Sequence, residues 1–259
     1  MDGELACCMA LATHATAWLR SRQTSPAGFE LTHSTMQFVG SIIFDDAAGV
    51  DGWMRQLAAD GVDRVWLAVP NLDPQDERGL AAHKAAAFAG GVQLGLLTTG
   101  AAGNRLWQAR WQIGDRNAPD QRIWTVTYRS QPVTSGPLLP DLQQAARFLN
   151  QALQHAEEFA SHNVLPPWDG LFAQARGQWS GSGEPRNVDH QDLFPDDRGH
   201  ADSHRLACMA QAAWVFGGMG SWNDLQFDEP DRQREYETIS RDLFAAVIRA
   251  CVAAVNAEA

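Results

Sequence analysis

The sequence predicts an α/β (α+β) fold: an N-terminal mixed sheet with crossover helices and an antiparallel edge hairpin, followed by an α-helical C-terminal half. Two observations predict the sheet. Short apolar runs alternate with amphipathic helical segments up to residue 100, and two later segments alternate apolar and polar residues one by one. Strand patterns then stop after "TSGPLLPD". We therefore expect an α/β module over residues 1–135 and a helical module over residues 136–259, either separate or packed as one domain.

The N-terminal region is expected to hold one helix and then one or two strands. The opening stretch "MDGELACCMALATHATAWLRSR" places Leu5, Met9, Ala12 and Leu19 roughly on one side of a helix. This stretch lacks a positive n-region and a sustained apolar core, so it does not resemble a secretory signal. The strands are predicted within "FELTHSTMQFVGSIIFDD".

The next four segments alternate between helix and strand. The stretch "GVDGWMRQLAADG" has helical spacing and ends in Gly61, which suits a left-handed helix cap. The apolar runs "VDRVWLAVP" and "VQLGLLTTG" are typical of strands buried on both faces, and the alanine-rich "DERGLAAHKAAAFAGG" lies between them as a helix. This order predicts right-handed crossovers and a parallel arrangement in this part of the sheet.

Strict alternation predicts an antiparallel hairpin at the sheet edge. The segments "LWQARWQI" and "IWTVTYR" are joined by the polar loop "GDRNAPDQ". The residues expected on the covered face are Trp107, Ala109, Trp111, Ile113, Trp124, Val126 and Tyr128. An aromatic face of this kind should pack against a helix.

The C-terminal half is predicted to consist of helices. Pro140 suits the first turn of a long amphipathic helix that extends to Phe159. Further helices are expected in "WDGLFAQARGQW", near residues 202 to 216 and near residues 231 to 256. The intervening stretch 177 to 200 is rich in glycine, proline and aspartate, which favours a loop.

Composition excludes several classes of partner. A net charge of −11 and a pI near 5.1 oppose binding to phosphate backbones, so we expect no nucleic-acid partner. No run of eighteen apolar residues occurs, so we expect no membrane span. The four cysteines show no CxxC spacing, which favours a reducing, cytoplasmic location over a disulfide scaffold.

Polar residues follow the expected strands and form the first candidate site. Asp45 and Asp46 follow one strand, and the stretch from Thr98 to Gly100 ends another. Two adjacent acids can bind a divalent metal ion through oxygen ligands, or can act as general acid and base. The alternative is structural, because Asp46 can simply cap the next helix. No GxGxxG, P-loop or GxSxG motif occurs in this half of the chain.

A cluster of histidines and aspartates in "DHQDLFPDDRGHADSH" is the second candidate site. His200 and His204 have i, i+4 spacing, and His190 precedes them. Imidazoles on one helix face are ligands that zinc accepts. The alternative is a solvated acidic loop, since neither H-E-x-x-H nor H-x-H-x-D is present.

The stretch "VFGGMGSWND" is the third candidate, interpreted either as a tight corner between helices or as a ligand or partner contact. The residues concerned are Gly217, Gly218, Gly220, Ser221, Trp222, Asn223 and Asp224. Glycines with free φ end a helix, and Ser221 suits a helix start, which supports the corner. Exposed backbone amides in a glycine turn can bind an anion, which supports a ligand. Trp168, Trp179 and Trp222 are the tryptophans expected at a contact surface.

Two functions are consistent with these patterns. The first is a non-catalytic accessory or binding protein that acts through protein contacts, including contacts with a second copy, or through a small ligand at the junction of the two modules. The alternative is a metal-dependent hydrolase of phosphoesters or amides, which would require a divalent metal at the Asp45 or His190 candidates. A hydrolase should bring Asp45, His200 and the "GGMGSWND" turn into one pocket.

Overall fold

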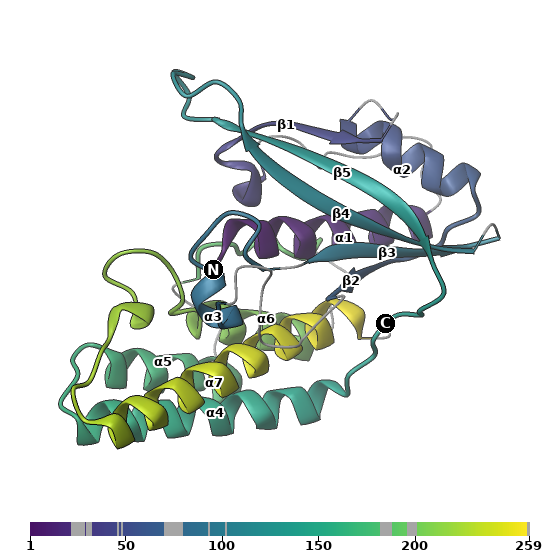
Figure 1. Cartoon of the computed structure of the whole chain (residues 1–259). Coiled ribbons are helices and arrows are strands. Elements are labelled where there is room, and N and C mark those ends of the chain that lie inside the picture. Colours follow the sequence, from purple (N-terminus) through teal and green to yellow (C-terminus); the bar gives the residue numbers. More distant parts are fainter. Residues whose placement is uncertain are drawn as a thin grey trace.

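A computed structural model describes most of the chain. The described residues are 1–21, 29, 33–45, 47, 49–69, 80–92, 94–101, 103–181, 188–195 and 201–257. Figure 1 shows a sheet with helices α1 and α2 beside it, and a layer of helices below it. These features confirm the predicted fold class, a mixed sheet with helices concentrated in the C-terminal half.

The predicted elements are present with small shifts of their ends, except that the helix expected over "DERGLAAHKAAAFAGG" is limited to Ala82–Ala85 within the described residues. The α-helices are α1 (Gly3–Ser21), α2 (Gly49–Ala59), α3 (Ala82–Ala85), α4 (Leu142–His162), α5 (Trp168–Ser180), α6 (Ala201–Ala212) and α7 (Pro230–Asn256). The strands are β1 (Val39–Phe44), β2 (Val65–Ala68), β3 (Gly95–Gly100), β4 (Gly103–Ile113) and β5 (Trp124–Val133). Short 3-10 helices are η1 (Ser34–Met36) and η2 (Trp222–Asp224).

The strand order differs from the order expected from the crossover pattern. The sheet runs β1-β5-β4-β3-β2, so the β4–β5 hairpin lies at the centre of the sheet and not at its edge. Strand β1 is parallel to β5, whereas β2 and β3 pair antiparallel. The expected parallel pairing of β2 and β3 is therefore corrected. A continuous apolar run indicates only that a strand is buried on both faces. Such a strand can pair with its neighbour in either direction, so the run does not predict parallel pairing.

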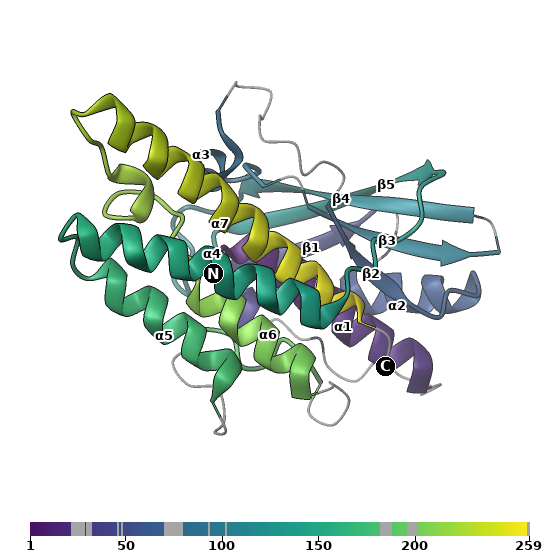
Figure 2. The same cartoon turned by 90° about the horizontal axis from the view of Figure 1, so that it is seen from below.

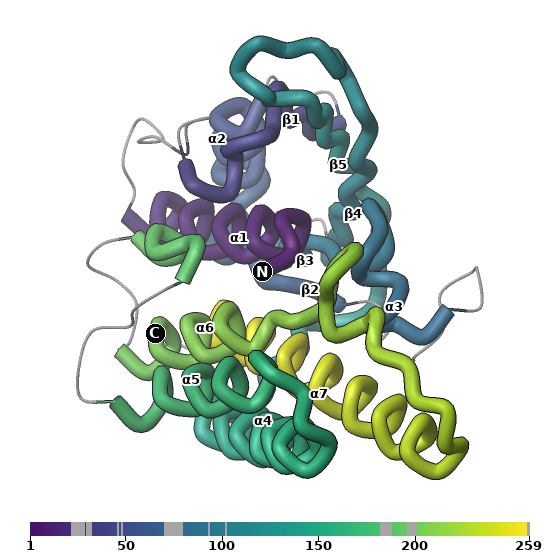
Figure 3. The backbone as a smooth tube through the Cα atoms, turned by 90° about the vertical axis from the view of Figure 1, so that its left-hand side faces the viewer, coloured from purple at the N-terminus to yellow at the C-terminus, as the bar shows by residue number. Residues whose placement is uncertain are grey.

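Helices α1 and α2 cover one face of the sheet, as Figure 3 shows. The inward face of the hairpin carries the predicted row of apolar residues, in which Val126 and Tyr128 are fully buried, whereas Ile113 at the end of β4 was expected to be covered and is 44% exposed. Arg110 and Arg129 occupy the opposite face and are exposed. This arrangement is typical of an antiparallel sheet with one solvated face.

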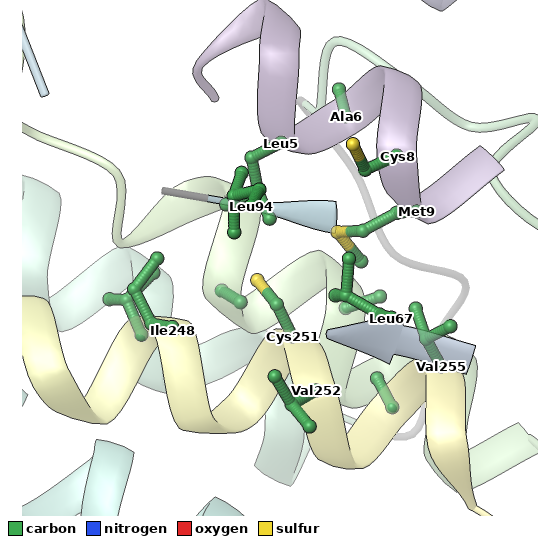
Figure 4. Close-up of a cluster of buried hydrophobic side chains, with 14 of the residues drawn as sticks. Leu5, Ala6, Cys8, Met9, Leu67, Leu94, Ile248, Cys251, Val252 and Val255 are labelled. Atoms are coloured by element: carbon green, nitrogen blue, oxygen red, sulfur yellow. The ribbon is translucent and has the colours of Figure 1, made fainter. Parts of the chain in front are cut away.

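Helix α1 forms the centre of the core. Every residue from Leu5 to Ala12 is buried, because the sheet lies on one side of the helix and α7 on another. Figure 4 shows Met9 of α1 extending toward Leu67 of β2, with Cys251 and Val255 of α7 beside them. One cluster of buried side chains thus includes both halves of the chain.

The outer edge of β2 is closed by two side chains. The Thr16 hydroxyl accepts from the Val65 N–H and donates to the Val65 carbonyl, each at 3.0 Å. The Asn256 amide pairs with the N–H and carbonyl of Leu67, each at 2.9 Å. Open strand edges invite pairing with other chains, and these contacts remove that possibility at β2.

Helices α4 to α7 form a layer against the β2 edge, seen from below in Figure 2. Each of these helices packs on its neighbours, and α7 also contacts β2. No helix within the described ranges is long and apolar enough to cross a membrane.

Candidate functional site

A cavity of about 470 Å³ lies between helix α2 and the inward face of the sheet. The helix contributes Trp53, Gln56 and Leu57 to its wall. The sheet contributes Asp45 after β1, the end of β3, and the first half of β4. A concave site with an apolar floor and a few polar groups at its mouth is the usual form of a small-ligand site.

The strand directions explain why these polar groups meet. Strands β1, β3 and β5 run in the same direction, so the carboxyl ends of β1 and β3 lie at the same edge of the sheet. Asp45, Thr98 and Gly100 therefore line one cavity. The sequence predicted Asp45 as a candidate, whereas Asp46 lies outside the described residues.

The carboxylate of Asp45 is fixed by Ser130 of β5. The Ser130 hydroxyl donates to Asp45 Oδ2 at 2.6 Å, and the Ser130 N–H donates to the same oxygen at 3.2 Å. Arg105 of β4 donates to the Ser130 hydroxyl through Nε at 3.2 Å and through Nη2 at 2.6 Å. A carboxylate and a guanidinium are thus held on either side of one hydroxyl.

The backbone of Asp45 is in the left-handed region. Its φ is +37°, which few residues other than glycine adopt. Strained conformations of this kind persist where surrounding contacts hold them, and they gather at functional sites. Here the Ser130 contacts to the carboxylate provide that restraint.

Stacked aromatic rings form the floor of the cavity. Phe44 stacks between Trp53, at 4.2 Å between ring centroids, and Tyr128, at 4.6 Å. The Trp107 ring meets Trp53 edge-on at 5.8 Å, and its N–H donates to Thr98. The indole N–H of Trp53 is buried and has no hydrogen-bond partner among the described residues. These contacts make the floor rigid.

A second depression, of about 780 Å³, lies between α4 and α7. Its polar lining includes His155, Glu158 and Glu235, all of which are exposed to solvent. In the cavity beside α2, by contrast, the half-buried carboxylate of Asp45 is held by two hydrogen bonds from Ser130. That cavity is therefore the better candidate.

The predicted histidine and aspartate ligands do not assemble into a metal centre within the described part of the chain. There, no group of three His, Cys, Asp or Glu side chains is placed to hold a metal ion. The ring of His204 packs edge-on against Phe194 at 6.0 Å. His200 lies outside the described residues.

His190 instead belongs to a polar cluster around Asp192. The Ser34 hydroxyl donates to Asp192 and lies 2.8 Å from His190 Nδ1. His14 and His33 contact the Asp192 carbonyl at 2.9 and 2.8 Å. In a nucleophile–base–acid triad the acid holds the imidazole that contacts the serine, whereas here Asp192 bonds Ser34 itself and lies 3.4 Å from a different imidazole, that of His33. The cluster fastens the segment 188–195 to α1 and η1.

The "GGMGSWND" stretch is a tight corner in this structure. Trp222 is fully buried, and its N–H donates to the Ser240 hydroxyl at 2.8 Å. Ser221 caps η2 by accepting from the N–H of Asn223. The left-handed conformation belongs to Gly220, at φ +86°, whereas Gly218 does not have a positive φ.

The expected tryptophan contact surface changes accordingly. Trp222 has no exposed surface to offer a partner, so its predicted place there is corrected. Trp168 packs edge-on against Trp222 at 5.6 Å and is half-buried, as is Trp179. Two more hydrogen bonds lie within the corner: the Ser221 hydroxyl donates to the Gly217 carbonyl, and the Gly220 N–H donates to the Asp224 carboxylate. Aromatic packing in the helical layer accounts for Trp222, because large rings are most stabilising when they are enclosed.

His83 lies beneath this corner as a buried neutral base. The side chain of Asn223 donates to the His83 carbonyl at 2.8 Å. Both ring nitrogens of His83 are buried and have no partner among the described residues. Burial, with a smaller effect of the neighbouring Lys84 charge, lowers the pKa of His83 to about 4.

His83 is expected to make the fold sensitive to mild acid. The unfolded chain takes up a proton near pH 6.5, whereas the folded chain does so near pH 4, so stability falls as the pH drops between these values. The loss approaches about 3 kcal/mol below pH 4. Urea titrations of the parent and of His83→Leu at pH 7, 5.5 and 4.5 test this. The same acid-induced loss in both proteins would contradict the assignment.

Comparison with known protein families, curated proteins and solved structures finds no match to this chain. The class of protein is therefore defined by its fold and its cavity alone: an α/β protein with a helical layer and a small polar-rimmed cavity beside α2.

Proposed function

We propose that this chain is a non-catalytic binding protein that holds a small ligand in the cavity between α2 and the sheet. The observation that carries the proposal is the pair of opposite charges, Asp45 and Arg105, joined through Ser130 above a rigid aromatic floor. Side chains fixed in this way need little reordering when a ligand binds, which favours affinity. The volume of about 470 Å³ is in the range of small-ligand sites.

The sequence also suggested binding through a protein partner or a second copy of the chain. That form of the hypothesis differs from ours in one measurable respect. Blocking the cavity removes small-ligand binding, but it leaves contacts on the outer surface unchanged.

The alternative of a metal-dependent hydrolase receives less support. It requires several metal-binding side chains in one place, and within the described ranges His190, His204 and Asp45 have separate surroundings. His190 also has its pKa lowered by burial, and its Nδ1 is already engaged by Ser34. No specific contact favours this second function.

A tryptophan placed at the cavity mouth tests the proposed function. Gln56 is exposed on α2 and lines the cavity, so Gln56→Trp should block the site without disturbing buried packing. The neighbouring Arg55 is exposed and does not line the cavity, so Arg55→Trp is the matched control. Ligand-observed NMR with a fragment library is expected to find ligands whose binding is lost, or at least tenfold weaker, only in Gln56→Trp. The proposal would be overturned if no fragment in the library lost binding as a result of the Gln56→Trp substitution.

A further inference from the structure

The mouth of the cavity carries charges of both signs, and the hydrogen bonds within the described part of the chain do not use all of their donors and acceptors. Arginine carries five N–H donors, and the contacts of Arg105 to Ser130 use only the Nε–H and one on Nη2. Among the described residues, the contact recorded for Asp45 Oδ1 is a long one, 3.4 Å, from the Ser130 N–H. A ligand can therefore receive donors from Arg105 and offer donors to Asp45 at the same time.

The rim also carries the carboxylate of Asp60, which accepts from Gln56 at 2.9 Å. Two carboxylates disfavour a simple anion, and the guanidinium of Arg105 disfavours a simple cation. A ligand with one carboxylate and one ammonium group can pair with Arg105 and with one of the two carboxylates, and Asp60 already accepts a hydrogen bond from Gln56. Because a single hydroxyl separates Asp45 from Arg105, the two ligand charges should sit close together, as on one carbon atom.

The floor of the cavity indicates the rest of the ligand. Phe44 and Trp53 are 0% exposed, and the faces of the Phe44 ring are covered by other rings. A sugar or a nucleobase needs an exposed ring face for stacking, which neither residue offers. Leu57 and Val62 also line the cavity, so an apolar side chain fits this part better than a polar one.

We infer that the ligand is a zwitterion, a free α-amino acid with an apolar side chain. Arg105 receives its carboxylate, Asp45 receives its ammonium, and the side chain lies toward Leu57 and Val62. This inference rests on the proposed function, because it names the ligand class of the same cavity.

Calorimetry on the full chain with matched analogues tests the inference. The probes are L-valine, L-leucine, L-methionine and L-phenylalanine. Two analogues of the best-binding amino acid are then compared with it. The amide keeps the ammonium group but has no carboxylate, and the deaminated acid keeps the carboxylate but has no ammonium group. We expect the zwitterion to bind at least tenfold more tightly than either analogue, since each analogue leaves one charged group of the site without its partner. Equal affinity for a zwitterion and one of its analogues would overturn the inference.

Two substitutions assign the charges to their partners. Arg105→Gln should weaken binding of the zwitterion at least tenfold and leave binding of the amide unchanged. Asp45→Asn should weaken binding of the zwitterion and leave binding of the deaminated acid unchanged. Asparagine is chosen because it tolerates the positive φ of this position. Arg110→Gln, on the opposite face of the same strand, is the control. A purely structural role for Arg105 would lower the melting temperature without changing the preference among analogues.

The outcomes separate this inference from the proposed function. If fragments bind in a manner that depends on position 56 but no amino acid binds, the ligand class is wrong and the binding function stands. If neither fragments nor amino acids bind, both proposals are overturned. Should a variant fail to fold, the analogue series on the parent chain still decides.

Discussion

Replacing Trp222 by alanine is expected to lower the free energy of unfolding by about 3 to 5 kcal/mol, the range for removing a fully buried large aromatic side chain. Trp222 has no exposed surface, and its ring meets those of Phe172 and Tyr236 at 5.1 and 5.5 Å. The substitution also removes the hydrogen bond to Ser240, at 2.8 Å. The corner thus stabilises the helical layer through its single tryptophan.

Urea denaturation of Trp222→Ala measures this effect, with Met219→Ala as the matched control. Met219 stands at the tip of the same corner and is fully exposed, so its truncation should change stability by less than about 0.5 kcal/mol. A loss below about 1 kcal/mol for Trp222→Ala would contradict the buried-corner interpretation. It would return Trp222 to the contact surface that the sequence suggested.

Asn256→Leu is expected to destabilise the chain by about 3 kcal/mol or more, because it leaves buried backbone groups unpaired. The Asn256 side-chain amide accepts from the Leu67 N–H and donates to the Leu67 carbonyl, and it also donates to the Leu138 carbonyl at 2.9 Å. Leucine has a similar size but makes none of these bonds. The junction between β2 and the end of α7 is therefore a polar contact on which the packing of the two halves depends.

Chemical denaturation tests this expectation, with Asn117→Leu as the control. Asn117 is exposed in the β4–β5 loop, so its replacement should leave stability within about 0.5 kcal/mol of the parent. Asn256→Asp adds a second test, since it keeps the acceptor for the Leu67 N–H and loses both donated bonds. At a pH low enough to protonate the new carboxyl group, the difference in unfolding free energy between Asn256→Asp and the parent should be smaller than at neutral pH. Wild-type stability of Asn256→Leu would show that the edge of β2 needs no cap.

Part of the candidate site could be predicted from the sequence. Asp45 was expected because it follows a strand, and strand ends of one direction meet at one edge. Ser130 and Arg105 were missed, although a signal exists: each is a polar residue on the otherwise apolar inward face of its hairpin strand. The signal is weak because the aromatic residues of the same face dominate the alternating pattern.

The other candidates show what spacing alone cannot decide. His190 and His204 are close in sequence, yet one bonds to Ser34 and the other packs on Phe194. The partner Ser34 lies more than 150 residues away from His190, and no local pattern links them. The glycines of the corner equally suited a turn or an anion site, and burial of Trp222 decided between them.

The sequence by itself determined the elements, the helical C-terminal half and the covered face of the hairpin, because periodicity and helix-ending residues act over a few neighbouring positions. Only the tertiary structure decided the strand order, the closing of β2 by Asn256 and the joining of Asp45 to Arg105 through Ser130. These features depend on contacts between residues far apart in the chain. Apolar runs record that a strand is buried, but they do not record which strand lies beside it or in which direction it runs.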